Sequence, residues 1–386
     1  MPTKTRSNKS KEKNVLVFVH RIYKKGVVKK GGADYIIDYL SKKNFDTYLV
    51  EHPLDGVGPT HFGAGKLVKK FLLFGSGPVR WVQEIAFNTF LFLFSFSLKK
   101  RKCDLVLAVD PLNFIAGDII RSFSGVKVHF HSVDYSEHRF ESPLLNKIYN
   151  FIYNFAVRNA DIVTYVSKPM KSKLEKLGSE RLGSILFHLP NSPEFKLMPR
   201  VPAGKREPGS VVYSKAFISD SEIKMLLEEF SVVAKKYPGA VLHLVGDVSE
   251  NSQGLLKESS LSENIKLHGL VSYEENLEIV SKCLVGLGWY ENKLSFEKYA
   301  DSLKIREYAA LGLPSICNDG ISTAYEMEEE GAGIMVGKGK SLSEALLLLF
   351  SNTKVYKSTS KNALKWARSM DKVDLLNDLY SQAKLL

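Results

Sequence analysis

Cysteine is scarce in this sequence. The chain of 386 residues holds three, Cys103, Cys283 and Cys317, and no two of them have the spacing of a metal-binding pair. An odd and low count in so long a chain excludes a disulfide framework and predicts reduced thiols in the cytoplasm. We expect each thiol to be a small buried side chain of the core.

Long apolar runs are scarce too. Residues 1–13 are polar and basic and lack the apolar stretch of a secretory signal, so we expect a flexible basic tail there. The most apolar segment lies within residues 79–98. Its purely apolar part is about a dozen residues long, whereas a helix needs about 20 to span a bilayer. The pattern therefore predicts no transmembrane helix.

Acidic residues are outnumbered by basic ones. Lys and Arg total 54 against 42 Asp and Glu, which gives a formal net charge of +12. A charge of this size indicates the kind of partner and not the fold: nucleic acid, an anionic membrane surface or a phosphorylated substrate. The basic residues are scattered and form no nucleic-acid-reading motif, so we predict no nucleic-acid partner.

Strand and helix patterns alternate along the chain in two successive sets. A buried strand at 14–20, a glycine-bearing loop and a helix at 33–43 begin the first set, which reads as βαβ units. Residues 193–208 contain four prolines and serve as a linker, after which the alternation restarts. We predict an α/β protein with two Rossmann-like doubly wound domains facing across a cleft. The predicted ranges are a first domain at 14–195, a second domain at 208–360 and a C-terminal helix at 361–386.

The aromatic segment within 79–102 does not fit the regular alternation of strands and helices that an α/β domain has. It ends in Lys99, Lys100, Arg101 and Lys102. One interpretation is an amphipathic helix that lies in one leaflet of a membrane, with the basic cluster on anionic headgroups. The other is a buried core helix whose basic end complements the helix dipole.

The stretch 301–317 runs from a helix through Gly and Pro into a strand. Asp301 and Ser302 are candidate caps at the helix start, where free N–H groups bind phosphate well. Lys304 adds positive charge, and Glu307 lies one turn away on the same face, where it can accept hydrogen bonds from sugar hydroxyls. The alternative is a surface ion pair between Lys304 and Glu307.

The run from Lys304 to Pro314 has the pattern Lys-x-x-Glu-Tyr-x-Ala-x-Gly-x-Pro. It resembles the donor-binding signature of the GT-B glycosyltransferases, in particular the group 1, family-4-like set. Stretches at 159–167, 189–191, 242–247 and 264–271 agree with it in order and spacing. The C-terminal signature is also similar to that of membrane-associated glucuronosyltransferases of exopolysaccharide synthesis.

The resemblance implies a GT-B fold. It further implies a UDP- or GDP-linked sugar donor in the second domain, an acceptor in the first and a last helix that crosses back to the first domain. Two positions depart from the family pattern. The family has a glycine in the first loop of its second domain; this sequence lacks it, and Lys215 is the candidate substitute. The family also has two spaced glutamates: Glu307 matches the second, but the first position falls near Tyr299, and Glu297 is out of register. The donor-binding residues implied are Gly31, Gly32, Lys215, Gly246, Asp247, His268, Gly269, Leu270, Ser302, Leu303, Lys304 and Glu307.

A second candidate site follows the predicted strand at 127–133. Asp134 lies at its carboxyl end, where sites of α/β proteins form, and is our candidate for the general base or for a group that polarises the acceptor hydroxyl. His131 shares a strand face with His129. The alternative for both histidines is a hydrogen-bonded place within the sheet, and a metal site lacks a third ligand. We count Asp134, His131 and Glu307 as the candidate catalytic residues.

No Asp-x-Asp occurs in the sequence. Carboxylates in that pattern hold the Mg²⁺ or Mn²⁺ that bridges a diphosphate in other transferases. We therefore expect neither metal nor cofactor, and positive groups with a helix end to stabilise the leaving nucleotide.

The predicted function is transfer of a sugar to an acceptor hydroxyl. The aromatic segment indicates a lipid-linked or cell-surface glycan acceptor and peripheral attachment to the inner face of the membrane. Two alternatives remain: a nucleotide-sugar 2-epimerase on the same fold, and a non-catalytic glycosyltransferase-like subunit of an assembly.

Overall fold

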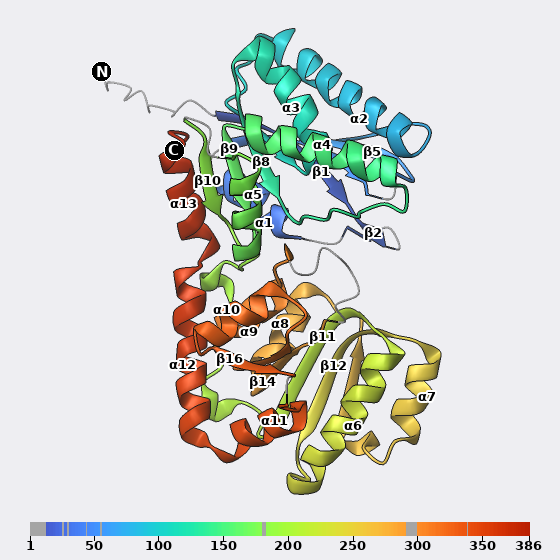
Figure 1. Cartoon of the computed structure of the whole chain (residues 1–386), viewed down its shortest axis with the longest axis vertical. Coiled ribbons are helices and arrows are strands. Elements are labelled where there is room, and N and C mark those ends of the chain that lie inside the picture. The colour runs from blue at the N-terminus through green and yellow to red at the C-terminus, as the bar shows by residue number, and fades with distance from the viewer. Residues whose placement is uncertain are drawn as a thin grey trace, which may run out of the picture. The chain divides into compact units, whose positions relative to one another are not determined.

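The computed structural model describes residues 13–24, 27–28, 31–43, 45–54, 56–179, 183–290, 299–337 and 339–386. The predicted basic tail lies outside these ranges except for Lys13, and Glu297 lies outside them too. The chain divides into two compact units (Figure 1): residues 1–189 with 375–386, and residues 190–374.

The first unit is built on an eight-stranded sheet in the order β10-β9-β8-β7-β1-β4-β5-β6. The strands from β10 to β4 are parallel, and β5 and β6 extend the sheet as an antiparallel hairpin. A short antiparallel pair, β2 with β3, stands apart. The strands are β1 (Lys13–Arg21), β2 (Tyr23–Lys24), β3 (Val27–Val28), β4 (Phe45–Pro53), β5 (Thr60–Ala64), β6 (Leu67–Phe71), β7 (Leu105–Val109), β8 (Lys127–Ser132), β9 (Ile162–Tyr165) and β10 (Ile185–His188).

Helices cover both faces of this sheet. Phe130 of β8 contacts Phe114 of α3 (Pro111–Ser124), while its neighbour His129 contacts Tyr380 of α13 (Lys372–Gln382). Because successive side chains of a strand point to opposite faces, α3 and α13 lie on opposite faces. The helices of this unit are α1 (Gly32–Lys42), α2 (Gly77–Phe92), α3 (Pro111–Ser124), α4 (Pro143–Asn159) and α5 (Lys168–Lys176), with a π-helical turn η1 (Leu93–Ser97) after α2.

The second unit has a six-stranded parallel sheet in the order β13-β12-β11-β14-β15-β16. This is the doubly wound order 3-2-1-4-5-6, in which ligands bind at the carboxyl ends of the strands beside the point where the order reverses. The strands are β11 (Ser210–Ile218), β12 (Val241–Val248), β13 (Ile265–Gly269), β14 (Val285–Gly288), β15 (Ser315–Asn318) and β16 (Gly333–Val336). The helices are α6 (Asp220–Lys236), α7 (Glu250–Glu258), α8 (Tyr273–Lys282), α9 (Leu303–Ala310), α10 (Ser322–Glu329), α11 (Leu342–Ser351) and α12 (Thr353–Ser369).

The predicted fold class, two doubly wound α/β domains, is confirmed. One helix prediction is wrong: residues 361–386 do not form one continuous helix. The chain breaks after α12 and restarts as α13 (Lys372–Gln382). The reason is Asp371, whose carboxylate accepts hydrogen bonds from the N–H groups of Val373 at 2.9 Å and Asp374 at 3.2 Å and so starts a new helix.

The aromatic segment forms α2 and η1, and its polar side faces inward. Arg80, Glu84 and Asn88 are all buried, whereas Val82 and Phe90 are 66% and 61% exposed. The alternative of a buried core helix is therefore contradicted at Val82 and Phe90, although Leu91 and Phe92 are buried. None of the helices that the structure describes is long and apolar enough to cross a bilayer.

Candidate active site

Helix α9 of the second unit carries the predicted donor signature. Ser302 is its N-cap, and its Oγ accepts a hydrogen bond from the N–H of Ile305 at 3.3 Å and lies 2.5 Å from the hydroxyl of Tyr290. Leu303 and Lys304 begin the helix. Of the two capping candidates, Ser302 is therefore confirmed.

Asp301 does not cap α9. Its carboxylate accepts hydrogen bonds from Nε of Arg306 at 2.9 Å and from Nη2 at 2.7 Å, and also from the backbone N–H of Asn191 at 2.6 Å. Arg306 is buried and completes its bonding with Glu326 and the ring of Trp366. The ion pairs of Arg306 with Asp301 and Glu326 therefore hold the start of α9 in place.

Glu307 is the unusual residue of this helix. It is 1% exposed, and one carboxylate oxygen, Oε2, lies 3.3 Å from Nζ of Lys304. The other oxygen, Oε1, is buried and meets no hydrogen-bond partner among the described residues. The pair is therefore no ordinary surface ion pair, because one member is buried. A buried carboxylate oxygen without a donor is costly unless a ligand supplies one.

Lys215 and Gly246 lie at the carboxyl ends of β11 and β12, the edge where α/β sites form. The Nζ of Lys215 is 2.6 Å from Oε1 of Glu222, so the lysine predicted to substitute for the missing loop glycine holds an ion pair. Gly246 has φ +146°, and a Cβ there would stand 1.8 Å from the carbonyl oxygen of Lys215. Asp247 pairs in register with Phe217. The glycine thus has a packing role, which the family resemblance did not reveal.

The remaining donor candidates lie on other elements. The ring of His268 stacks on His243 of β12, with its Nε2 3.1 Å from Nδ1 of that ring. Gly269 ends β13 with φ +69°, and Leu270 is 56% exposed. In the first unit, Gly31 precedes α1 and Gly32 begins it.

The candidates of the acceptor side converge on β8 of the first unit. His131 is buried, with Nδ1 2.8 Å from Oγ1 of Thr164, which also lies 2.7 Å from Nε2 of His129. Within the described ranges no His, Cys, Asp and Glu side chains gather in threes as metal ligands. The two histidines therefore occupy the hydrogen-bonded places in the sheet that we kept as an alternative.

Asp134 follows β8 and forms an ion pair with Arg139. Burial alone would lower the pKa of Arg139, but Tyr149 and the carboxylates Asp134 and Asp110 outweigh it and raise the pKa. Both carboxylates therefore act on one guanidinium, at the edge of the sheet where β7 and β8 end.

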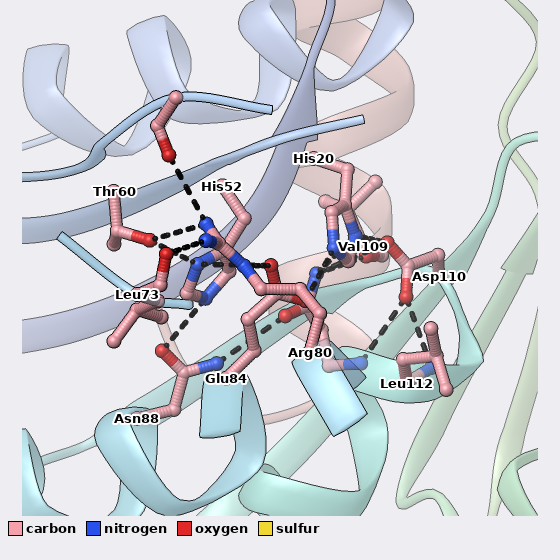
Figure 2. Close-up of polar contacts among 12 residues, drawn as sticks. His20, His52, Thr60, Leu73, Arg80, Glu84, Asn88, Val109, Asp110 and Leu112 are labelled. Atoms are coloured by element: carbon pink, nitrogen blue, oxygen red, sulfur yellow. Dashed lines mark hydrogen bonds and ion pairs between the residues drawn. The ribbon is translucent and has the colours of Figure 1, made fainter. Parts of the chain in front are cut away.

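Sequence reasoning missed a polar network beside this edge (Figure 2). His20 lies near the end of β1 and Asp110 follows β7, which are the two strands at the reversal point of the sheet order. The Nδ1 of His20 bonds Asp110, and its Nε2 is 3.1 Å from Oε2 of Glu84 of α2. Burial alone would lower the pKa of His20, but Asp110 and Glu84 outweigh it and raise the pKa to about 10. His20 is thus a cation held between two carboxylates.

Asp110 adopts φ +77° and ψ 162°, a conformation otherwise almost confined to glycine. Its side chain accepts hydrogen bonds from the N–H groups of Leu112 at 2.9 Å and Asn113 at 3.1 Å and so caps α3. Strained residues of this kind concentrate at functional sites. The sequence offered one signal for Asp110, its position directly after a predicted strand. Its pairing with His20 could not be predicted, because it depends on the order of the strands in the sheet.

The network continues along the inward side of α2. Arg80 is fully buried, with Nε 2.7 Å from Oε1 of Glu84 and Nη1 2.7 Å from the carbonyl oxygen of Leu73. Asn88 bonds Nε2 of His52 at 3.1 Å (Figure 2), and burial lowers the pKa of His52 to about 4. Two cations and two carboxylates thus balance in charge and fasten α2 to the sheet.

Known proteins support the same architecture. Residues 198–366 match the model of the family described as glycosyl transferases group 1. A sucrose-phosphate synthase from Thermosynechococcus elongatus aligns at 15% identity and TM-score 0.65, covering 96% of this chain and 99% of its own. HepE from Anabaena, solved in complex with UDP-glucose, aligns at 15% identity and TM-score 0.64, with 97% and 100% coverage.

A trehalose-6-phosphate synthase, OtsA, aligns at 11% identity and TM-score 0.63, covering 97% of this chain and 99% of its own. A comparison of the sequence with curated proteins gives no match. At these identities the solved structures show the fold alone. The family model matches residues of the second unit only. The whole chain therefore has the GT-B fold of these solved structures, and its residues 198–366 match the model of the group 1 glycosyl transferases.

Proposed function

We propose that the chain transfers a sugar from a nucleotide-sugar donor to an acceptor hydroxyl, with the donor held at α9. The observation that carries this proposal is the buried Oε1 of Glu307, which meets no donor among the described residues. Ribose and sugar hydroxyls are donors that a carboxylate oxygen can bind strongly. HepE, of the same fold, was solved with UDP-glucose, which supports a donor of this class.

The chemistry of donor binding follows from the charges at α9. N–H groups at the start of a helix and the ammonium of Lys304, which is 34% exposed, attract a diphosphate. These groups stabilise the negative charge that develops on the departing nucleoside diphosphate. We propose that no metal is needed, because the sequence offers no Asp-x-Asp and the site offers positive groups.

On the acceptor side we retain Asp134 as the proposed base. Its carboxylate is 29% exposed, so an acceptor hydroxyl can reach it, and Arg139 orients it. His20 is a poor base at neutral pH, because its pKa is about 10 and both of its ring nitrogens are bonded to carboxylates. We assign His20 and Asp110 a positioning role at the reversal point of the first sheet.

A donor screen tests the proposed reaction. The intact protein is mixed with UDP- and GDP-linked sugars, and the melting temperature and the release of nucleoside diphosphate are measured. We expect one nucleotide class to raise the melting temperature, because a ligand that binds only the native state stabilises it. Conversion of the donor into its 2-epimer without acceptor would instead support the epimerase. No shift and no turnover with any donor would contradict the proposal.

We further propose that the acceptor is lipid-linked and that the first unit contacts an anionic membrane through α2 and η1. The apolar side of this segment forms a shallow exposed groove lined by Val82, Ile85, Ala86, Thr89, Phe90, Leu93 and Ile119. Phe94 and Leu98, which follow in the chain, are 56% and 72% exposed. Exposed apolar patches beside basic clusters are typical of membrane contact, and Lys99 to Lys102 follow directly. A role in cell-surface polysaccharide synthesis would follow from such an acceptor.

The membrane contact predicts a loss of vesicle binding in the double variant Phe90→Ser/Leu93→Ser. Each large apolar side chain contributes about 1.5–3 kcal/mol when buried, so we expect a loss of at least tenfold in affinity for vesicles of phosphatidylcholine with phosphatidylglycerol. The matched control is Val232→Ser/Leu348→Ser in the second unit, where both side chains are about as exposed as Leu93, at 42% and 39%. Sedimentation with vesicles is the measurement, and equal binding by both variants would refute the contact.

A further inference from the structure

The first unit has a cationic cavity at the amino-terminal ends of its parallel strands, opposite to the candidate site at their carboxyl ends. Its wall includes Lys13 at the start of β1, Lys127 at the start of β8, and Lys102 and Asp104 just before β7. The candidate residues His20, Asp110 and Asp134 lie instead at or after the carboxyl ends of these parallel strands. The cavity is thus separate from the site that carries out the transfer. It has a volume of about 480 Å³.

Positive charge dominates this cavity. Five basic residues line it against one carboxylate, that of Asp104: they are Lys13, Arg101, Lys102, Lys127 and Lys384. The carboxylate is itself occupied, because Oδ1 lies 2.8 Å from Nζ of Lys102 and Oδ2 accepts the N–H of Asn14 at 2.9 Å. Most of the positive charge therefore meets no opposite charge among the described residues.

The two lysines at the strand starts are held in place by neutral groups. Nζ of Lys13 donates to the carbonyl oxygen of Leu385 at 2.7 Å, and Nζ of Lys127 donates to that of Ala383 at 2.6 Å. An ammonium group has three N–H donors, so each lysine retains donors for a ligand. A carbonyl oxygen fixes the position of the charge without neutralising it.

Arg101 is fixed in a similar way. Its backbone N–H donates to the carbonyl oxygen of Phe96 at 2.9 Å, which ties it to η1, and its Nη1 donates to the hydroxyl of Tyr48 at 2.5 Å. A guanidinium has five N–H donors, so others remain available to a phosphate. Lys13, Arg101 and Lys127 thus come from three separate segments of the chain, and each is held at the cavity by a hydrogen bond to a neutral group.

The cavity lies next to the apolar groove on α2 in the chain, because Phe92 of the cavity is followed directly by Leu93 of the groove. Phe92 and Phe123 line the cavity, and their rings lie 5.8 Å apart. Phe123 is 51% exposed and stands one helical turn after Ile119, which lines the groove. A molecule that reaches both must be anionic at one end and apolar at the other.

We propose that this cavity binds the phosphate of an anionic phospholipid headgroup, whose acyl chains lie along the groove of α2. The inference rests on the membrane contact put forward above and names its lipid partner. A headgroup site differs from diffuse attraction in that it uses the cations that line the cavity, including Lys384, which is far from the basic run in sequence. Free phosphate carries the same anionic group but lacks the apolar part, so the two ligands can be told apart.

The test compares Arg101→Gln/Lys384→Gln with Lys235→Gln/Lys236→Gln. Both pairs remove two exposed positive charges, the first from the cavity and the second from the end of α6. At about 1 kcal/mol for each charge near an anionic surface, we expect the first pair to lose roughly tenfold or more in affinity for equimolar phosphatidylcholine–phosphatidylglycerol vesicles. Its binding to pure phosphatidylcholine should not change, and the second pair should bind both vesicles as the parent does.

Three outcomes would overturn the proposal. Equal losses in both pairs would mean diffuse attraction, and no loss in the first pair would mean that the cavity holds no headgroup. Binding of inorganic phosphate or glycerol phosphate as tightly as vesicles, lost in the first pair, would make it a site for soluble phosphate. Failure of the membrane contact itself would appear separately, as unchanged vesicle binding in Phe90→Ser/Leu93→Ser.

Discussion

Glu307→Gln should lower the rate of sugar transfer by about 100-fold without lowering the free energy of unfolding. A hydrogen bond to a charged group contributes about 1.5–3 kcal/mol, and every 1.4 kcal/mol is a factor of ten in rate. Glutamine keeps the shape but removes the charge that receives the sugar hydroxyl. The measurement is kcat/KM with saturating acceptor, beside denaturant unfolding of the same preparation.

Stability should be equal or higher in this variant. Oε1 of Glu307 is buried without a partner among the described residues, and an amide is less costly to bury in that state than a carboxylate. A gain in stability together with a loss in rate is typical of a residue kept for function.

Glu326→Gln is the matched control for this prediction. Glu326 is also a buried glutamate with one unpartnered oxygen in the described residues, but its Oε2 lies 3.1 Å from Nη2 of Arg306. We expect this variant to lose stability, because a buried guanidinium loses a charged partner, and to keep kcat/KM within a few-fold. If both variants lose rate equally, or if Glu307→Gln keeps its rate, Glu307 has no direct role with the donor.

Gly246→Ala should be among the most damaging single-methyl changes in the second unit. The added Cβ would stand 1.8 Å from the carbonyl oxygen of Lys215, and φ at this position is +146°. The obstacle is backbone and not the end of a flexible side chain, so β11 would have to move away from β12. Overpacking and strain of about 1–3 kcal/mol each lead us to expect a loss of roughly 3 kcal/mol or more in the free energy of unfolding.

The control for this change is Gly254→Ala. Gly254 lies in the middle of α7, and a Cβ there would meet nothing within 4 Å. Alanine is the better helix former by about 0.8–1 kcal/mol, so this variant should be more stable than the parent. Opposite signs in urea unfolding of the two variants are expected. A loss below about 1 kcal/mol in Gly246→Ala would show that the two strands adjust easily.

The elements that the sequence predicted best are the parallel strands. The uninterrupted apolar run 15–19, inside the predicted strand 14–20, is buried, as expected for a parallel strand covered on both faces. The signature at 301–317 was also readable, because its cap, its helix and its following strand are local features. The hairpin of β5 and β6 was not predicted, since β6 is exposed along most of its length and shows no alternation of burial.

The orientation of α2 could not be read from its own sequence. Arg80, Glu84 and Asn88 look like the solvent side of an amphipathic helix, yet they are buried because their partners come from β1, β4, β5 and α3. Such a network depends on contacts between segments that are distant in the chain. The same holds for Gly246, whose role appears only when β11 lies beside it.

The most direct test of the account is the crystal structure of the full chain with a bound nucleotide sugar selected by the donor screen. We predict the diphosphate at the start of α9 beside Lys304, and a ribose or sugar hydroxyl within hydrogen-bond distance of Oε1 of Glu307. A donor bound elsewhere, with Oε1 of Glu307 left without a ligand, would contradict the central claim.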